Sequence, residues 1–181
     1  MAKILYIHGF ASCGNSTKTK LLKAYYGEDV VCAPDVPIDP DEAILLLQKL
    51  IEREGITLLI GSSLGGFYAS YLSEYFRIKA VLINPSTTPY TTLASYIGEN
   101  TYWCSKTSFI WTQAYLEALR SYVVLPTPLR YLLLLHKGDE VLDYKVAEAF
   151  YLGAKTLNQE GGNHRFENLE SYFKEIDGFR V

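Results

Sequence analysis

The chain has 181 residues, of which 49% are hydrophobic and 20% are charged, and its formal net charge is −3. This balance is typical of a folded domain and excludes an intrinsically disordered chain. No run of Lys or Arg occurs, which excludes a nucleic-acid surface built on phosphate contacts. We expect a single domain over residues 1–181.

The cysteines bear on the cellular compartment. Cys13, Cys32 and Cys104 are widely spaced, and no C-x-x-C pair or Cys/His cluster occurs. We therefore expect neither a disulfide framework nor a zinc site, with Cys13 as a small buried side chain, and a reducing cytoplasm fits best. The N-terminus does not resemble a signal peptide, and no apolar stretch approaches the length of a membrane span.

The first half of the chain alternates short apolar runs with amphipathic segments. Continuous apolar runs are typical of buried parallel strands, and they occur here at 3–7, 30–33, 57–60 and 79–83. Helices are expected between them. One begins at Ser16 or Thr17 and reaches Tyr26, one runs from the Asp39 cap to Gly55, and one follows the third strand to about residue 76.

Residues 86–125 interrupt this alternation. Helices are plausible at about 90–97 and 109–121, and the composition becomes aromatic: Tyr90, Tyr96, Tyr102, Trp103, Phe109, Trp111, Tyr115 and Tyr122. An excursion of this length usually covers something, so we interpret it as a cap or partial lid that lines an acyl pocket. The alternative is a satellite hydrophobic core.

The regular pattern then resumes and completes the sheet. Strands are expected at 129–135 and 154–157, a helix capped by Asp143 runs to Leu152, and a final helix covers about 166–176. Six strands that alternate with helices predict an α/β fold with a mostly parallel six-stranded sheet and helices on both faces. Ligands bind such sheets at the carboxyl ends of the strands, where His8, Ser63, Asp139 and His164 all fall.

The segment Gly61-Ser62-Ser63-Leu64-Gly65 follows the third strand and opens a helix. The apex residue of such a turn has a strained backbone, and side chains two positions away on either side would collide. Glycines at 61 and 65 remove that collision. We therefore interpret Ser63 as a nucleophile and Ser62 as a supporting residue, and the alternative is a turn that serves packing alone.

A serine nucleophile needs a base, and the base needs a carboxylate that orients it. His164, in the loop after the last strand, is the expected base, whereas His136 more plausibly anchors its loop. Asp139 is the expected carboxylate; Glu140 and Asp143 are the alternatives, although Asp143 is better used as a helix cap. The order Ser63, Asp139, His164 is that of α/β-hydrolases.

The oxyanion that forms during acyl transfer needs hydrogen-bond donors. The backbone N–H of Leu64 is one expected donor, and the N–H of Phe10, at the end of the first strand, is the second. His8 and Gly9 are expected to order this loop. Asn163 is assigned a supporting role next to the base, and Asp35 is a loop residue without an assigned task.

Five motifs are distributed from the first strand to the last helix: Tyr6-Ile7-His8-Gly9-Phe10, Gly61-Ser62-Ser63-Leu64-Gly65-Gly66, Asn84-Pro85, Gly138-Asp139-Glu140-Val141-Leu142-Asp143-Tyr144 and Glu160-Gly161-Gly162-Asn163-His164. Together they resemble the YqiA-type small bacterial esterases (UPF0227-like) of the α/β-hydrolase superfamily. The resemblance implies a Ser63–Asp139–His164 triad that hydrolyses carboxylic esters or acyl thioesters, without a metal or organic cofactor.

The substrate would then be a small molecule carrying a small or medium acyl group. The same fold and triad also serve hydrolases of thioester, amide or carbon–carbon bonds, which spacing alone does not separate. A non-catalytic binding protein that retains the hydrolase fold is the alternative from a different class.

Overall fold

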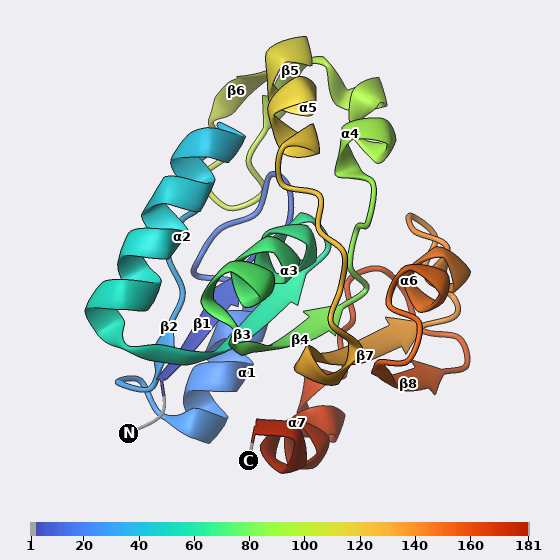
Figure 1. The fold of residues 1–181 in the computed structure, drawn as a ribbon. Coiled ribbons are helices and arrows are strands. Elements are labelled where there is room, and N and C mark those ends of the chain that lie inside the picture. Colours follow the sequence, from blue (N-terminus) through green and yellow to red (C-terminus); the bar gives the residue numbers. More distant parts are fainter. Residues whose placement is uncertain (1–2, 181) are drawn as a thin grey trace.

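A six-stranded sheet runs through the computed structural model, which describes residues 3–180 (Figure 1). The strands are β1 (Lys3–Ile7), β2 (Val31–Cys32), β3 (Ile56–Ser62), β4 (Lys79–Ile83), β7 (Tyr131–His136) and β8 (Lys155–Gln159). Their order across the sheet is β2-β1-β3-β4-β7-β8, and each neighbouring pair is parallel. The predicted α/β fold with a six-stranded parallel sheet is confirmed.

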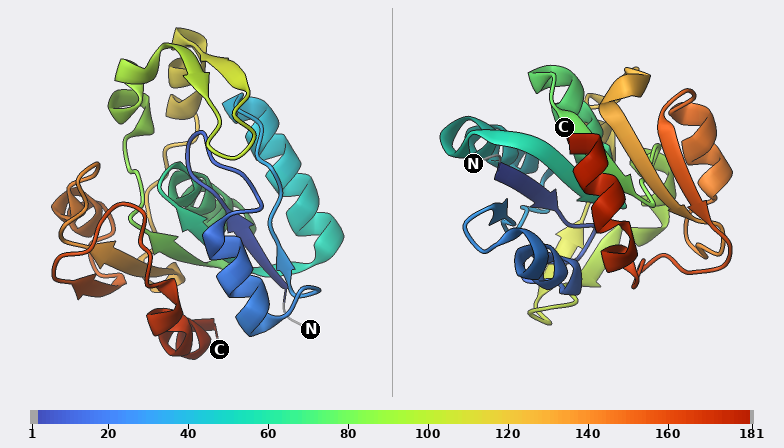
Figure 2. Two further views of the ribbon diagram at one scale, coloured as in Figure 1. Left: turned by 180° about the vertical axis from the view of Figure 1, so that it is seen from behind. Right: turned by 90° about the horizontal axis from the view of Figure 1, so that it is seen from below.

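Helices cover both faces of this sheet (Figures 1 and 2). One face packs against α1 (Thr17–Tyr26), the 3₁₀ turn η3 (Leu169–Tyr172) and α7 (Phe173–Arg180). The other packs against α2 (Pro40–Glu54), α3 (Leu64–Phe76) and α6 (Tyr144–Phe150). Successive residues of the central strands alternate between the two hydrophobic clusters, as the period of two in a strand requires.

Local capping chemistry explains the clearest helix boundaries. The Asp39 carboxylate accepts hydrogen bonds from the N–H groups of Asp41 and Glu42, and Pro40 occupies the first helical position of α2. Gly55 ends that helix with a left-handed backbone, φ 64°. Ser16 likewise caps α1 by accepting from the N–H of Thr19. These boundaries agree with the sequence prediction.

The final predicted helix, 166–176, has different bounds. Phe166 has a left-handed backbone with φ 53°, which no helix tolerates, and the segment continues as η3 and then α7. The predicted strand at 129–135 is also shifted, because residues 128–130 form the short 3₁₀ turn η2 (Pro128–Arg130). In that turn the Arg130 guanidinium pairs with Glu74 of α3.

The segment 86–125 lies beyond the ends of the central strands, at the top of Figure 1. It contains α4 (Pro89–Thr92), the turn η1 (Ala94–Tyr96), the antiparallel hairpin β5 (Gly98–Thr101) and β6 (Ser108–Trp111), and α5 (Gln113–Arg120). The hairpin was not predicted, and its second strand replaces the start of the helix expected at 109–121. Trp111 is fully buried and Phe109 is 9% exposed, both within the main hydrophobic core.

One disulfide bond joins this segment to the loop after β1. Cys13 and Cys104 are 91 residues apart in sequence and bonded in the structure, whereas Cys32 is a free thiol. The prediction that the cysteines form no disulfide is therefore wrong for this pair, and Cys13 is not an isolated apolar side chain. The bond also removes the argument for a reducing compartment that rested on the cysteines. Among residues 3–180, no helix is both long and apolar enough to span a membrane.

Candidate active site

Ser63 stands at the turn between β3 and α3. Its backbone has φ 55° and ψ −119°, a conformation that is costly for any residue with a side chain. A Cβ atom on Gly61 would lie 2.3 Å from the carbonyl oxygen of Gly65, and one on Gly65 would lie 2.1 Å from that of Ile7 in β1. Both glycines are thus required for strand and helix to approach each other around Ser63.

Gly9 brings the loop after β1 against the same serine. A Cβ atom on Gly9 would lie 3.2 Å from the Cβ of Ser63 and 3.7 Å from its Oγ, so the backbone of this loop runs directly beside the nucleophile candidate. The adjoining N–H of Phe10 and the N–H of Leu64 are the predicted oxyanion donors. Leu64 is the first residue of α3, and N–H groups at that end of a helix have no acceptor within the helix.

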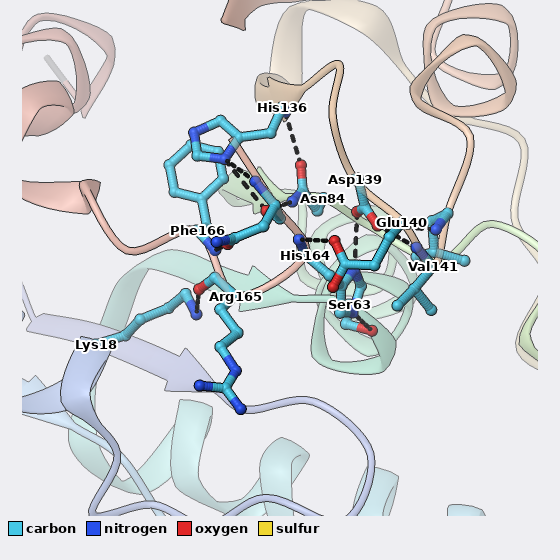
Figure 3. A network of polar contacts seen from close by, with 12 residues as sticks. Lys18, Ser63, Asn84, His136, Asp139, Glu140, Val141, His164, Arg165 and Phe166 are labelled. Carbon is cyan, nitrogen blue, oxygen red and sulfur yellow. Dashed lines mark hydrogen bonds and ion pairs between the residues drawn. The ribbon is translucent and has the colours of Figure 1, made fainter. Parts of the chain in front are cut away.

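His164 lies between Ser63 and Asp139 (Figure 3). Its Nε2 atom is 3.1 Å from Ser63 Oγ, and its Nδ1 atom is 2.8 Å from Asp139 Oδ2. The Asp139 side chain is 2% exposed and that of His164 is 21% exposed. The structure therefore brings together the three residues that were predicted as nucleophile, base and orienting carboxylate, with the base nitrogen facing the hydroxyl.

The second oxygen of Asp139 fixes its direction. Asp139 Oδ1 accepts hydrogen bonds from the backbone N–H groups of Val141 and Leu142, at 2.8 and 2.9 Å. Asp143, one of the alternatives, instead caps α6 by accepting from the N–H of Lys145. Each carboxylate is thus occupied differently, and only Asp139 contacts the imidazole.

Glu140, the other alternative, contacts the same histidine at its main chain. Its Oε2 atom accepts a hydrogen bond from the backbone N–H of His164 at 3.0 Å. That bond, followed by one from the N–H of Glu140 itself, holds the pKa of the Glu140 carboxyl below its ordinary value. Asp139 and Glu140 thus hold the side chain and the backbone of His164 separately.

We call residues 160–166 the histidine loop, and a buried cluster of Asn84, His136 and Phe166 holds its underside; the sequence analysis expected only His136 to anchor a loop. Asn84, directly after β4, accepts the His136 N–H through Oδ1 and donates through Nδ2 to the Asn163 carbonyl. The His136 ring stacks on Phe166, with centroids 3.8 Å apart, and its Nδ1 accepts from the Asn163 N–H at 3.2 Å. The signal for Asn84 was its place between a buried strand and a proline.

The predicted supporting role of Asn163 corresponds to contacts within this loop. Its Oδ1 atom accepts from the Phe166 N–H, and its Nδ2 atom donates to Glu167. The Lys18 ammonium of α1 donates to the carbonyl of Arg165, so the loop is also held from the opposite side (Figure 3). Ser62, the other supporting serine, is buried in β3 at 6% exposure.

We call residues 9–14 the oxyanion loop, and two polar side chains order it. The Val36 N–H donates to His8 Nε2 at 3.0 Å, so the ring proton is on Nδ1, which donates to the Gly9 carbonyl at 2.9 Å. Burial lowers the pKa of His8, which favours this neutral form. Asp35, without an assigned task from the sequence, accepts the Gly14 N–H at 2.7 Å.

The aromatic residues of 86–125 surround Phe10. The ring centroids of Tyr96, Phe109 and Trp111 lie 5.5, 5.6 and 5.0 Å from that of Phe10, all in edge-to-face arrangements. We call these four rings the Phe10 cluster. It joins the predicted cap to the oxyanion loop and to the main core, so Phe109 and Trp111 do not form a separate satellite core, and the cap or partial lid over an acyl pocket stays a prediction.

A depression of about 500 Å³ lies beside the loop between β7 and α6, which carries Asp139, but Ser63 is not part of its lining. Its lining is mostly polar: Lys137, Asp139, Glu140, Val141, Leu142, Asp143, Tyr144, Lys145 and Glu160. Acyl groups favour apolar linings, so this depression is a poor candidate for an acyl pocket. Among residues 3–180, no group of three or more His, Cys, Asp or Glu side chains could hold a metal ion.

Comparison with known sequences gives a family. The model of a family described as "Uncharacterised protein family (UPF0227)" matches residues 3–181. A UPF0227 protein from Serratia proteamaculans is 25% identical over 192 residues, and the UPF0227 protein YcfP from Salmonella paratyphi A is 24% identical over 191 residues. Each of these matches covers 98% of this chain and 98% of the relative.

Comparison with solved structures gives the fold. Est1E from Butyrivibrio proteoclasticus with bound ferulic acid has a TM-score of 0.74 at 15% identity, covering 99% of this chain and 88% of that one. The esterase domain of a Rhodothermus marinus protein has a TM-score of 0.68 at 20% identity, covering 98% and 85%. A Paleococcus ferrophilus monoacylglycerol lipase has a TM-score of 0.70 at 14% identity, covering 98% and 93%. The fold is that of the α/β-hydrolases.

Proposed function

The chain belongs to the UPF0227 family, and we propose that it is a serine esterase of small or medium acyl esters, with acyl thioesters as the second substrate class. The observation that carries this proposal is the continuous chain of contacts from Ser63 Oγ through the His164 ring to Asp139, at 3.1 and 2.8 Å. Hydroxyl, imidazole and carboxylate in this arrangement are the parts that nucleophilic acyl transfer needs.

In the proposed reaction, Ser63 Oγ attacks the acyl carbonyl while His164 Nε2 takes the hydroxyl proton. The Asp139 carboxylate keeps the Nδ1 proton in place and stabilises the imidazolium that forms. The N–H groups of Phe10 and Leu64 donate to the oxyanion. His164 then protonates the leaving alcohol or thiol, and water activated by the same histidine releases the acyl group from Ser63.

The names of the structural neighbours support an ester as the bond that is cleaved, since they include an esterase domain and a monoacylglycerol lipase. The substrate in this proposal is a small molecule without a nucleic-acid partner. The cytoplasm stays the proposed compartment although the Cys13–Cys104 disulfide does not support it, and cell fractionation tests this.

Labelling with a fluorophosphonate probe tests the nucleophile. We expect the probe to modify Ser63 in the folded protein, and peptide mapping by mass spectrometry to locate the adduct there. Ser63→Ala should abolish labelling, whereas Ser62→Ala is the matched control that retains it. Folded protein that remains unmodified at Ser63 would rule the nucleophile out.

A substrate panel tests the bond that is cleaved. We expect turnover of p-nitrophenyl esters of short or medium chain length, compared with acyl-CoA thioesters of the same lengths. Thioester turnover alone would move the proposal to thioesterases. Hydrolysis by the wild-type protein that equals that of Ser63→Ala would favour a non-catalytic binding protein instead.

A further inference from the structure

Three contacts tie the oxyanion loop to the β5–β6 hairpin. The Cys13–Cys104 disulfide is covalent, the Trp103 N–H donates to the Ala11 carbonyl at 2.8 Å, and the Phe10 ring packs within the Phe10 cluster. All three lie within four residues of one another on the oxyanion loop. The position of the Phe10 amide beside Ser63 therefore depends on the hairpin.

The backbone at Ala11 shows that this position is imposed. Ala11 has φ 56°, a left-handed conformation that costs free energy in a residue with a Cβ atom. Such a conformation persists only where the surroundings hold it. The hydrogen bond from the Trp103 N–H to the Ala11 carbonyl and the disulfide at Cys13 both connect the loop to the hairpin. Breaking the disulfide therefore removes a restraint two residues from the strained position.

The disulfide is more exposed to solvent at Cys104 than at Cys13. Cys104 is exposed, as are its neighbours Trp103 and Ser105, whereas Cys13 is only partly buried. We therefore expect a small dithiol to reach the bridge at Cys104 without unfolding of the core. The free thiol Cys32 is partly buried at the end of β2, and burial raises its pKa, which disfavours its thiolate.

We propose that Cys13–Cys104 is a thiol–disulfide modification site that controls the oxyanion loop, with the oxidised protein as the active form. A dithiol reductant supplies two electrons and two protons: the sulfur–sulfur bond breaks, Cys13 and Cys104 become thiols, and the reductant becomes a cyclic disulfide. A disulfide oxidant of the same class reverses the step. This inference rests on the proposed esterase function, because its readout is the chemistry at Ser63.

The reduced form keeps the triad but loses the covalent restraint on the Phe10 amide. The contacts of Asp139 and His164 lie on other loops and are not tied to the hairpin. Displacement of a catalytic group by about 1 Å can cost about 100-fold in rate, so we expect reduction to lower kcat by about 10- to 100-fold. KM should change less, because the oxyanion contact is made mainly in the transition state.

The test compares oxidised and dithiothreitol-reduced wild-type protein in p-nitrophenyl ester turnover, with non-reducing peptide mapping of the 13–104 bridge. Cys104→Ser should have the lower kcat under both conditions and no response to the reductant. Cys32→Ser, the matched control, should respond like the wild type. Circular dichroism of the reduced wild type checks that the fold persists, so that the comparison does not depend on a variant that fails to fold.

The fluorophosphonate labelling rate of Ser63 separates the two proposals. Labelling that is faster in the oxidised form supports control by the bridge. Equal labelling and equal kcat in both forms would overturn this inference and leave the esterase standing. Absence of labelling in both forms would overturn the esterase itself, and absence of a 13–104 bridge after oxidation would overturn the modification site alone.

Discussion

Two loops meet at Ser63, and they are held by different kinds of interaction. The histidine loop is fixed by directional hydrogen bonds between its backbone and the side chains of Asn84, which donates, and His136 and Glu140, which accept. The oxyanion loop also receives hydrogen bonds, one of them from the hairpin residue Trp103, but it is joined to the hairpin mainly by a disulfide and packed aromatic rings. The proposed base, His164, thus lies on a loop held by hydrogen bonds, and the proposed oxyanion donor, Phe10, lies on a loop held partly by apolar packing.

This difference predicts whether substitutions near each loop reduce activity, stability or both. Hydrogen bonds specify angles, so small changes under the histidine loop should reduce catalysis with little loss of stability. Packed rings contribute mainly buried area, so changes in the Phe10 cluster should reduce stability as well. The following experiments test this contrast.

The largest effect on kcat is expected for substitution of Asp139. Asp139→Asn keeps the shape of the side chain but can donate where the carboxylate accepts, which favours the wrong tautomer of His164. By analogy with the same change in a serine protease, kcat should fall by about 10⁴-fold. Steady-state kinetics measure this, and Asp143→Asn is the matched control, expected to lose only part of a helix cap. Equal losses in the two variants would remove Asp139 from the triad.

The next effect concerns the Phe10 cluster. Trp111→Ala should lower the free energy of unfolding by about 3–5 kcal/mol, because the ring is fully buried. Trp103→Ala, in which the ring is 67% exposed and the N–H to Ala11 is retained, should stay within about 0.5 kcal/mol. Urea unfolding measures both. A small loss at Trp111 would mean that packing does not hold this half of the site.

A third experiment uses two adjacent glycines in the histidine loop. A Cβ atom on Gly162 would lie 2.2 Å from His136 Nδ1, whereas one on Gly161 would meet nothing within 4 Å. Both have positive φ, at 74° and 68°, so the backbone strain of an alanine is matched. Gly162→Ala should lower kcat by about 100-fold, through displacement of His164. Similar kcat values for the two variants would show that the His136 contact does not position the loop.

The smallest effect is a pH dependence of stability that originates in His8. Burial lowers its pKa in the folded protein below the ordinary value of about 6.5, so the unfolded chain binds the proton more readily. The stabilisation is complete above that pH and is lost as the pH falls. His8→Gln can keep both hydrogen bonds without titrating. Its melting temperature should therefore fall less than that of the wild type between about pH 7.5 and about pH 5.

Much of the site could be predicted because the ends of buried strands can be identified from the sequence. A buried run that stops at Gly61 or at His136 marks the sheet edge, and parallel topology brings such edges together. The contact geometry of Ser63, Asp139 and His164 agrees with that reasoning, although their catalytic roles stay predictions until labelling and kinetics are done.

The residues that were missed depend on tertiary structure. Asn84 bridges the last residue of β7 and the histidine loop after β8, and nothing in its local sequence identifies either partner. Cys13 and Cys104 are 91 residues apart, a separation at which sequence alone gives no pairing. The hairpin at 98–111 has short strands, and its rings pack against Phe10, so a partner far away in sequence decides its structure.

The backbone of Ser63 has a consequence for how its presence is explained. Its φ of 55° costs a residue with a side chain about 1–3 kcal/mol, which glycine would largely avoid. Folding alone would therefore favour Ser63→Gly as a stabilising substitution at this turn. A serine in this strained backbone conformation gives the protein a lower free energy of unfolding than a glycine would. What the protein keeps in exchange is a hydroxyl group at this turn.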